Sequence, residues 1–200
     1  MKNNFNPKNG RVIVELGKKF NDSISIGGRE FILDNAFRKM FHAVQNATVI
    51  AYANGCDLNV GDKVYVHHFV VEDERAVPVK GKDYRWLEYS QIYCRVRDDK
   101  IKVLGDYVLV EPVKYNDSNF KKYSDSGILL HQKAGTEEVE RFGTVKYVSE
   151  FAETNGLNVG DTIFFNKNCE YELTVEGERL YRMEFRDIIS VVNSDVEFVV

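Results

Sequence analysis

The stretch Leu58-Asn-Val-Gly-Asp62 recurs unchanged as Leu157-Asn-Val-Gly-Asp161, 99 residues later in a chain of 200 residues. Asn, Gly and Asp favour tight turns. Each copy is followed by a short run of β-branched and aromatic residues, Lys63-Val-Tyr-Val66 and Thr162-Ile-Phe-Phe165. Each pentapeptide therefore predicts a turn that opens a strand, and the recurrence indicates an internal repeat.

Other segments repeat in the same order. Four further pairs match at separations of 95 or 96 residues: 12–15 with 108–111, 19–23 with 114–118, 48–49 with 144–145, and 88–92 with 184–188. We therefore expect two copies of one unit, residues 1–104 and residues 105–200. No Pro-, Gly- or Ser-rich linker separates them.

Short strands dominate each predicted unit. The runs 12–14 and 107–110 are typical of strands buried on both faces. Residues 172–175 and 179–182 predict a hairpin around Glu176-Gly177, and residues 187–192 predict a closing strand. About six short strands per unit predict an all-β fold of two tandem small antiparallel barrels. Apolar residues spaced at i, i+3, i+4 and i+7 favour one short helix over residues 37–44, packed on the first barrel rather than docking elsewhere.

Composition narrows the classes of function. The chain is 44% hydrophobic, which excludes wholesale disorder. Its net charge of −4 argues against nucleic acid as a partner. No apolar run is long enough for a membrane span or a signal peptide, so we expect a soluble, cytoplasmic protein. The three cysteines are too widely spaced for a metal-binding pair and are expected to be apolar core residues.

Taken in order, residues 105–193 resemble the GroES family of co-chaperonins. The segments that carry the resemblance are the opening strand from Gly105 to Pro112, the apolar tripeptide Ile128-Leu129-Leu130 after Gly127, the strand from Phe142 to Val145, the turn from Leu157 to Asp161, and the closing strand from Asp187 to Val192. The resemblance implies that residues 113–130 form the family's mobile loop. It also implies that Ile128, Leu129 and Leu130 bind a chaperonin ring.

The first unit resembles the family more loosely. Phe31-Ile32-Leu33 aligns with the apolar tripeptide at a separation of 97, and Gly27-Gly28 flank that loop. The resemblance thus implies two fused GroES-like barrels, of which the first has diverged. The roof hairpin that the family commonly carries is replaced by polar loop residues at 146–158, as in phage-encoded members, which suggests a bacteriophage source.

The resemblance implies a co-chaperonin that caps a chaperonin ring and assists ATP-dependent folding, with the nucleotide bound by the partner. The family forms sevenfold rings, which two barrels per chain cannot fill evenly. Both apolar tripeptides could instead be ordinary barrel strands. The alternative function is a structural or adaptor protein, perhaps of a virion, that keeps the barrels without binding a chaperonin.

No catalytic, metal or cofactor site is expected. The chain has no nucleophile, phosphate-loop or dinucleotide motif. His67 and His68 are adjacent on a predicted strand, so their side chains should point to opposite faces and be unable to share a metal ion. An enzyme is therefore not expected.

Overall fold

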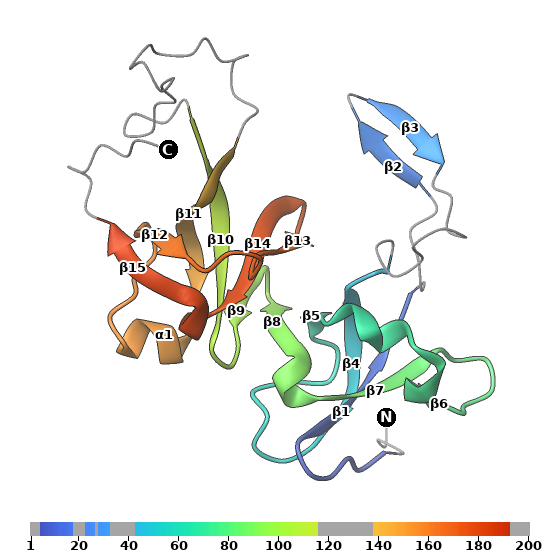
Figure 1. Ribbon diagram of the computed structural model, residues 1–200. Helices are drawn as coiled ribbons and strands as arrows, with labels where there is room; N and C mark the ends of the chain where they lie inside the picture. The colour runs from blue at the N-terminus through green and yellow to red at the C-terminus, as the bar shows by residue number, and fades with distance from the viewer. Residues whose placement is uncertain (1–4, 18–22, 27, 33–42, 116–137, 193–200) are drawn as a thin grey trace, which may run out of the picture. The chain divides into compact units, whose positions relative to one another are not determined.

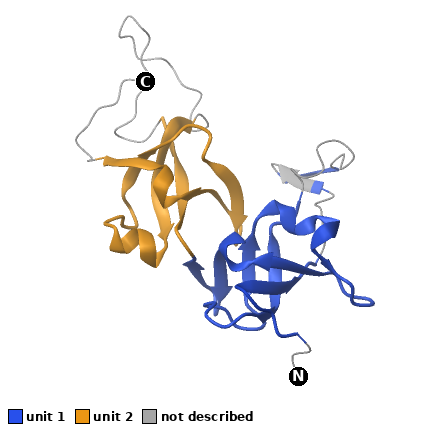
Figure 2. Cartoon of the chain, turned by 60° about the horizontal axis from the view of Figure 1, so that its bottom comes forward, with its two compact units in different colours: residues 1–104 blue, residues 105–200 orange. Residues whose placement is uncertain are grey.

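A computed structural model describes residues 5–17, 23–26, 28–32, 43–115 and 138–192 (Figure 1). The chain divides into two compact units, residues 1–104 and residues 105–200 (Figure 2). Among the described residues, no helix has the length and apolar composition needed to cross a membrane.

The first unit is built on an antiparallel sheet with the strand order β6-β7-β1-β4-β5-β8-β9. Its strands are β1 (Arg11–Glu15), β4 (Asn46–Tyr52), β5 (Lys63–Val66), β6 (Ala76–Val77), β7 (Tyr84–Glu88), β8 (Ile92–Arg97) and β9 (Lys100–Val103). The 3-10 turns η2 (His68–Val71) and η3 (Asp73–Arg75) follow β5, and η4 (Tyr89–Gln91) joins β7 to β8. A separate two-stranded sheet pairs β2 (Ser23–Ile26) with β3 (Arg29–Ile32).

The second unit has an antiparallel sheet with the order β13-β14-β10-β11-β12-β15. Its elements are β10 (Tyr107–Lys114), β11 (Glu138–Val148), the helix α1 (Glu150–Thr154), β12 (Thr162–Phe165), β13 (Tyr171–Val175), β14 (Glu178–Glu184), the 3-10 turn η5 (Phe185–Asp187) and β15 (Ile188–Val192). Strands β13 and β14 are joined by Glu176 and Gly177, both at positive φ (47° and 87°), as a tight two-residue hairpin requires.

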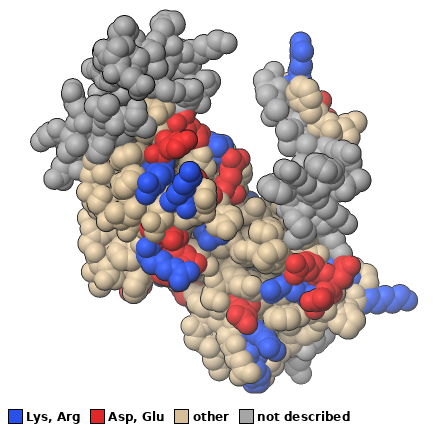
Figure 3. Space-filling model, viewed as in Figure 1, with Lys and Arg blue, Asp and Glu red and all other residues tan. Residues whose placement is uncertain are grey.

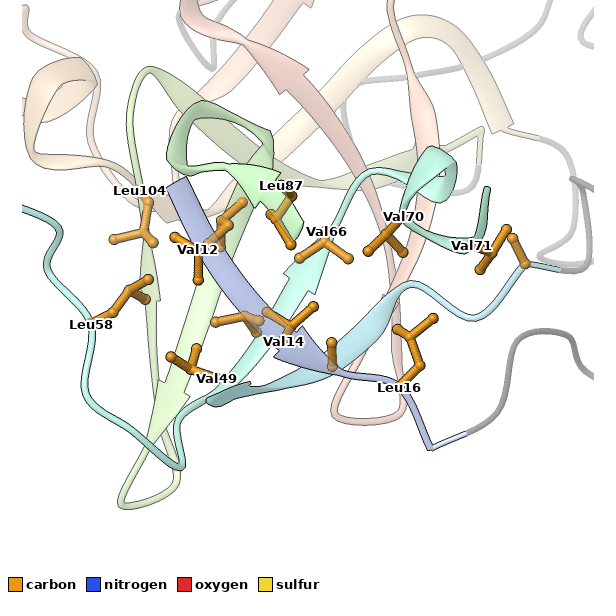
Figure 4. Close-up of a cluster of buried hydrophobic side chains, with 14 residues drawn as sticks. Val12, Val14, Leu16, Val49, Leu58, Val66, Val70, Val71, Leu87 and Leu104 are labelled. Carbon is orange, nitrogen blue, oxygen red and sulfur yellow. The ribbon is translucent and has the colours of Figure 1, made fainter. Parts of the chain in front are cut away.

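Each unit has its own apolar core. In the first, Val12 and Val14 of β1 are fully buried among side chains from β4, β5, β7 and β8, together with Val70 and Val71 of η2 (Figure 4). In the second, Val108 and Val110 of β10 take the corresponding places. Burying one aliphatic side chain contributes about 1.5–3 kcal/mol, so these clusters are the main stabilising term of each sheet.

The two large sheets share their strand order: β6, β7, β1, β4, β5 and β8 correspond in turn to β13, β14, β10, β11, β12 and β15. Both first strands also carry a bulge at the same place, between Ile13 and Val14 and between Leu109 and Val110. Strand β9 has no counterpart after β15 among the described residues.

The predicted all-β fold is confirmed, although the edge strands of neither sheet pair with each other among the described residues, so both sheets stay open. The predicted strands at 12–14, 63–66 and 162–165 lie within β1, β5 and β12, and the hairpin around Glu176-Gly177 is present. Most of the predicted helix at 37–44 lies outside the described residues. Its last residue, Val44, is buried and not helical.

Two expectations were wrong. The polar loop expected at 146–158 instead contains the end of β11 and the helix α1. Ser149 caps this helix by accepting a hydrogen bond from the Ala152 N–H (3.3 Å), and Ala152 is fully buried. His67 and His68 do not alternate on a strand, because β5 ends at Val66 and η2 begins at His68. Their rings stack with centroids 4.3 Å apart.

Candidate functional site

The predicted chaperonin-binding loop of the second unit leaves the sheet between two paired strands. Strand β10 ends and β11 begins on either side of residues 116–137, and Lys114 pairs with Glu138 across this base. Ile128, Leu129, Leu130 and Gly127 lie outside the described residues.

A small apolar cluster holds the base of this loop closed. Val113 of β10 and Tyr115, just after this strand, pack against Val139 and Phe142 of β11, and all four are buried. Bringing the ends of a segment together restricts the chain. The cluster therefore holds the two described segments that flank residues 116–137 close together.

A polar network lies beside the apolar cluster. The Glu138 carboxylate accepts hydrogen bonds from the Arg179 guanidinium and the Tyr181 hydroxyl, and Arg179 also pairs with Glu172 (2.8 Å). Partial burial alone would raise the pKa of Glu138, but the bonds from Tyr181 and Arg179 hold it below its ordinary value. The network ties the first residue of β11 to β13 and β14.

Close pairing of β10 and β11 at the base of the loop also requires a glycine at position 143. A Cβ built on Gly143 would lie 2.2 Å from Cγ1 of the buried Val110 and 3.1 Å from the carbonyl oxygen of Glu111. Strands β10 and β11 can therefore approach this closely only if position 143 has no side chain. The sequence placed this glycine in a strand but gave no sign of the contact, which joins residues distant along the chain.

The candidate loop of the first unit leaves its sheet at the corresponding place, between β1 and β4. Part of it forms the hairpin β2–β3, in which Gly28 lies at the turn with φ of 77°. Phe31 and Ile32 lie on β3 and are 49% and 90% exposed. The alternative that they extend the barrel sheet does not hold for these two residues, because β3 pairs with β2 in a separate sheet. Gly27 and Leu33 lie outside the described residues.

Within the described ranges, no three His, Cys, Asp or Glu side chains gather closely enough to hold a metal ion. On the face shown in Figure 3, acidic and basic side chains lie next to one another. Among the described residues, Arg179 and Glu172 form one such ion pair (2.8 Å).

Comparison with known proteins shows what the second unit is similar to. Residues 100–192 match the family model described as the chaperonin 10 kDa subunit, Cpn10. Over 92 residues, the chain is 26% identical to a co-chaperonin GroES of Fusobacterium nucleatum subsp. nucleatum and 27% identical to one of subsp. polymorphum. Each alignment covers 46% of this chain and 97% of the relative. Residues 100–192 are therefore similar to the chaperonin 10 kDa subunit family over nearly the length of one such subunit.

Proposed function

We propose that this protein is a co-chaperonin that caps a chaperonin ring during ATP-dependent protein folding, with ATP bound by the ring. The proposal is supported by the match of residues 100–192 to the Cpn10 family model and by a separate alignment of 92 residues that covers 97% of a GroES relative. The chain itself would carry out no bond chemistry.

The contact would be made by apolar residues in the two loops. Ile128, Leu129 and Leu130 are the main anchor, and Phe31, Ile32 and Leu33 assist. The exposure of Phe31 and Ile32 supports the second part, because apolar side chains on a short hairpin are available to a partner. The closed base formed by Val113, Tyr115, Val139 and Phe142 supports the first part, because it holds the two ends that flank the intervening segment close together.

Weak anchors suit this work. Burying three aliphatic side chains stabilises a complex by roughly 1.5–3 kcal/mol each, and ordering the loop offsets much of that gain. Several loops on one assembly then act together through their effective concentration. Such a cap binds firmly only when many loops engage and can leave when the ring changes state.

We further propose that the first unit is a diverged second copy of the co-chaperonin domain. The shared strand order and the matching bulges support this. So do the repeated turns. The Asn59 N–H donates to the Asp62 carboxylate (2.7 Å) as the Asn158 N–H donates to that of Asp161 (2.8 Å).

The same comparison suggests how copies assemble. In the first unit, β9 covers the outer edge of β8, and β9 is the segment that leads into β10. In the second unit, β15 pairs only with β12 among the described residues, and its Ile189 and Val191 are 51% and 46% exposed. The segment that leads into the other first strand is residues 5–10. We therefore infer that residues 5–10 of a second copy cover β15, giving head-to-tail contacts that close into a ring.

Charge supports this arrangement. Residues 1–104 contain 17 Lys and Arg against 13 Asp and Glu, a net charge of +4. Residues 105–200 contain 10 against 18, a net charge of −8. A head-to-tail contact places a basic unit against an acidic one, whereas contacts between like units would be repulsive.

Assembly is tested by native mass measurement of charged variants. Ile189→Lys combined with Val191→Lys should reduce the oligomer to smaller species, because charged residues block pairing at an edge strand. Val159→Lys is the matched control, since Val159 is 61% exposed but lies in a turn. A monomeric unsubstituted chain, or an oligomer unaffected by the β15 changes, would contradict the proposed contact.

Chaperonin binding is tested by pull-down with a bacterial chaperonin ring, with and without ATP. Leu129→Asp should abolish the complex, and Ile32→Asp should weaken it, while Val159→Asp should leave it intact. Loss with Val159→Asp as well would show a general surface effect rather than loop binding. A chain that binds no chaperonin but co-purifies in a larger particle would favour the adaptor function.

A further inference from the structure

Both units carry an Asn-Gly pair in the connection that precedes the repeated turn. In the first unit this is Asn54-Gly55, between β4 and β5. In the second it is Asn155-Gly156, at the end of α1 before β12. Both pairs are exposed and both glycines have nearly the same φ, 90° and 91°. The two sites therefore share sequence, exposure and glycine geometry.

Asn-Gly is the dipeptide most open to intramolecular attack, because glycine has no side chain to hinder its own backbone nitrogen. That nitrogen loses its proton and bonds to Cγ of the asparagine, while the Cγ–Nδ2 bond breaks and ammonia leaves. Water then opens the cyclic imide at either carbonyl, which yields aspartate or isoaspartate. Water is the only co-reactant, and nothing is oxidised or reduced.

The second pair is held against this reaction by α1. The Asn155 side chain donates from Nδ2 to the carbonyl oxygen of Phe151 (2.8 Å), which fixes its amide group. The Gly156 N–H donates to the carbonyl oxygen of Glu153 (2.9 Å), so the attacking nitrogen is also engaged. Both bonds belong to the end of the helix and must break before ring closure.

The first pair has no such restraint. No helix forms between β4 and β5, and within the described part of the chain neither the Asn54 side chain nor the Gly55 N–H makes a hydrogen bond. The nearest backbone bond, from the Cys56 N–H to the carbonyl oxygen of Ala53 (3.4 Å), spans the pair without engaging either reacting group.

We propose that Asn54 is a site of spontaneous deamidation in the folded protein, and that α1 protects Asn155. The modification places a new carboxylate close in sequence to Asp57, which is paired with Arg95 (3.2 Å) and Lys102 (2.8 Å). It lowers the net charge of residues 1–104 from +4 to +3. The inference is independent of chaperonin binding.

The test is peptide mapping by mass spectrometry of the full-length protein, incubated folded at mildly alkaline pH and, in parallel, in denaturing urea. In the folded protein, the peptide containing Asn54 should gain the mass of one amide-to-acid exchange at least about tenfold faster than the peptide containing Asn155, because the helix end must open first. In urea the two rates should converge.

Two variants distinguish the effect of the fold on the deamidation rate from the effect of the Asn-Gly sequence itself. Ser149→Ala removes the cap of α1 and should raise the rate at Asn155 without changing the rate at Asn54. Asn54→Gln should abolish the fast mass gain of the peptide that contains position 54, since the longer glutamine side chain closes a ring poorly. Equal deamidation rates at the two sites in the folded chain would overturn the proposal. So would an Asn54 that stays intact in the folded protein while it reacts in urea.

Discussion

The two units use one pentapeptide in the same turn but surround it differently. In both, the glycine N–H donates back to the preceding strand (Gly61 to Val49 and Gly160 to Val145, 2.8 Å each). In the first unit, Asp62 is 5% exposed and its carboxylate accepts two hydrogen bonds from Arg97 (2.8 and 2.6 Å). Asp161 is only half-buried. The same turn sequence thus fixes the backbone, whereas the following strands decide what the aspartate does.

The difference extends along the last strand of each sheet. Arg95 and Arg97 of β8 are paired with Asp57 and Asp62, and β9 lies along the outer edge of β8. Strand β15 carries exposed aliphatic residues instead. The first unit covers this edge with a strand of its own chain, whereas among the described residues no strand pairs with the outer edge of β15.

The largest effect is expected from removing the buried aspartate. Asp62→Ala removes the buried acceptor of two Arg97 hydrogen bonds and of the Asn59 N–H, and should destabilise the first unit by about 3 kcal/mol. Asp161→Ala loses a single turn hydrogen bond and should cost about 1 kcal/mol in the second unit. Urea unfolding followed by fluorescence of the sole tryptophan, Trp86 of β7, reports the first unit, and calorimetry resolves the second. Equal losses of stability from the two substitutions would contradict the different roles assigned to the two aspartates.

A slightly smaller loss of stability is expected from substitutions in β4 and β11, the strands that pair with β1 and β10. Gly143 corresponds to Ala47, since each precedes the Thr-Val pair that adjoins the first strand. Gly143→Ala should destabilise the second unit by about 2 kcal/mol, because its Cβ would strike the buried Val110. Ala47→Gly should cost the first unit only about 1 kcal/mol. Calorimetry of both variants tests the prediction, and a harmless Gly143→Ala would contradict it.

The helix cap gives a third contrast. Ser149→Ala should destabilise the second unit by about 1 kcal/mol, since the Ala152 N–H loses its acceptor. The first unit has no helix in the matching connection and should be unaffected. Chemical denaturation with separate probes for each unit measures both. A loss shared by the two units would mean that the cap is not a local feature.

The smallest expected effect is the loss of folding stability of the first unit at acidic pH. Hydrogen bonds from Arg97 lower the pKa of Asp62, although its burial alone would raise it, and a hydrogen bond from Lys102 lowers the pKa of Asp57. Because these pKa values are lowered in the folded state, the stability they contribute is present above about pH 4 and is lost as the pH falls through the lowered values. Arg97→Met should therefore lower the free energy of unfolding less at acidic pH than at neutral pH. Urea unfolding followed by Trp86 fluorescence measures this difference. An equally large loss at acidic pH would contradict this.

Much of the fold followed from local patterns. The turn at Leu58 and its copy at Leu157, the short apolar strands and the Glu176-Gly177 hairpin all depend on neighbouring residues. The helix α1 did not stand out, because its five residues show no apolar period and its stability comes from the Ser149 cap and the buried Ala152. The stacked His67 and His68 were misplaced because η2 interrupts the strand pattern.

The candidate site was less predictable than the fold. The apolar tripeptides came from resemblance to a family, and the placement of Phe31 on a separate hairpin had no signal in the sequence. The base of the second loop depends on contacts between Glu138 and Arg179 and between Gly143 and Val110, which join distant parts of the chain. Such contacts become visible only once the strands are paired.

Co-chaperonin function is tested most simply by the mass of the complex that forms when the intact chain is mixed with a chaperonin ring. With ATP, the unsubstituted chain should appear in a stable complex whose mass shows several copies on the ring, and Leu129→Asp should not. If the folded chain forms no complex in any nucleotide state, or if Leu129→Asp binds as well as the unsubstituted chain, the account of this protein as a co-chaperonin acting through its second loop is wrong.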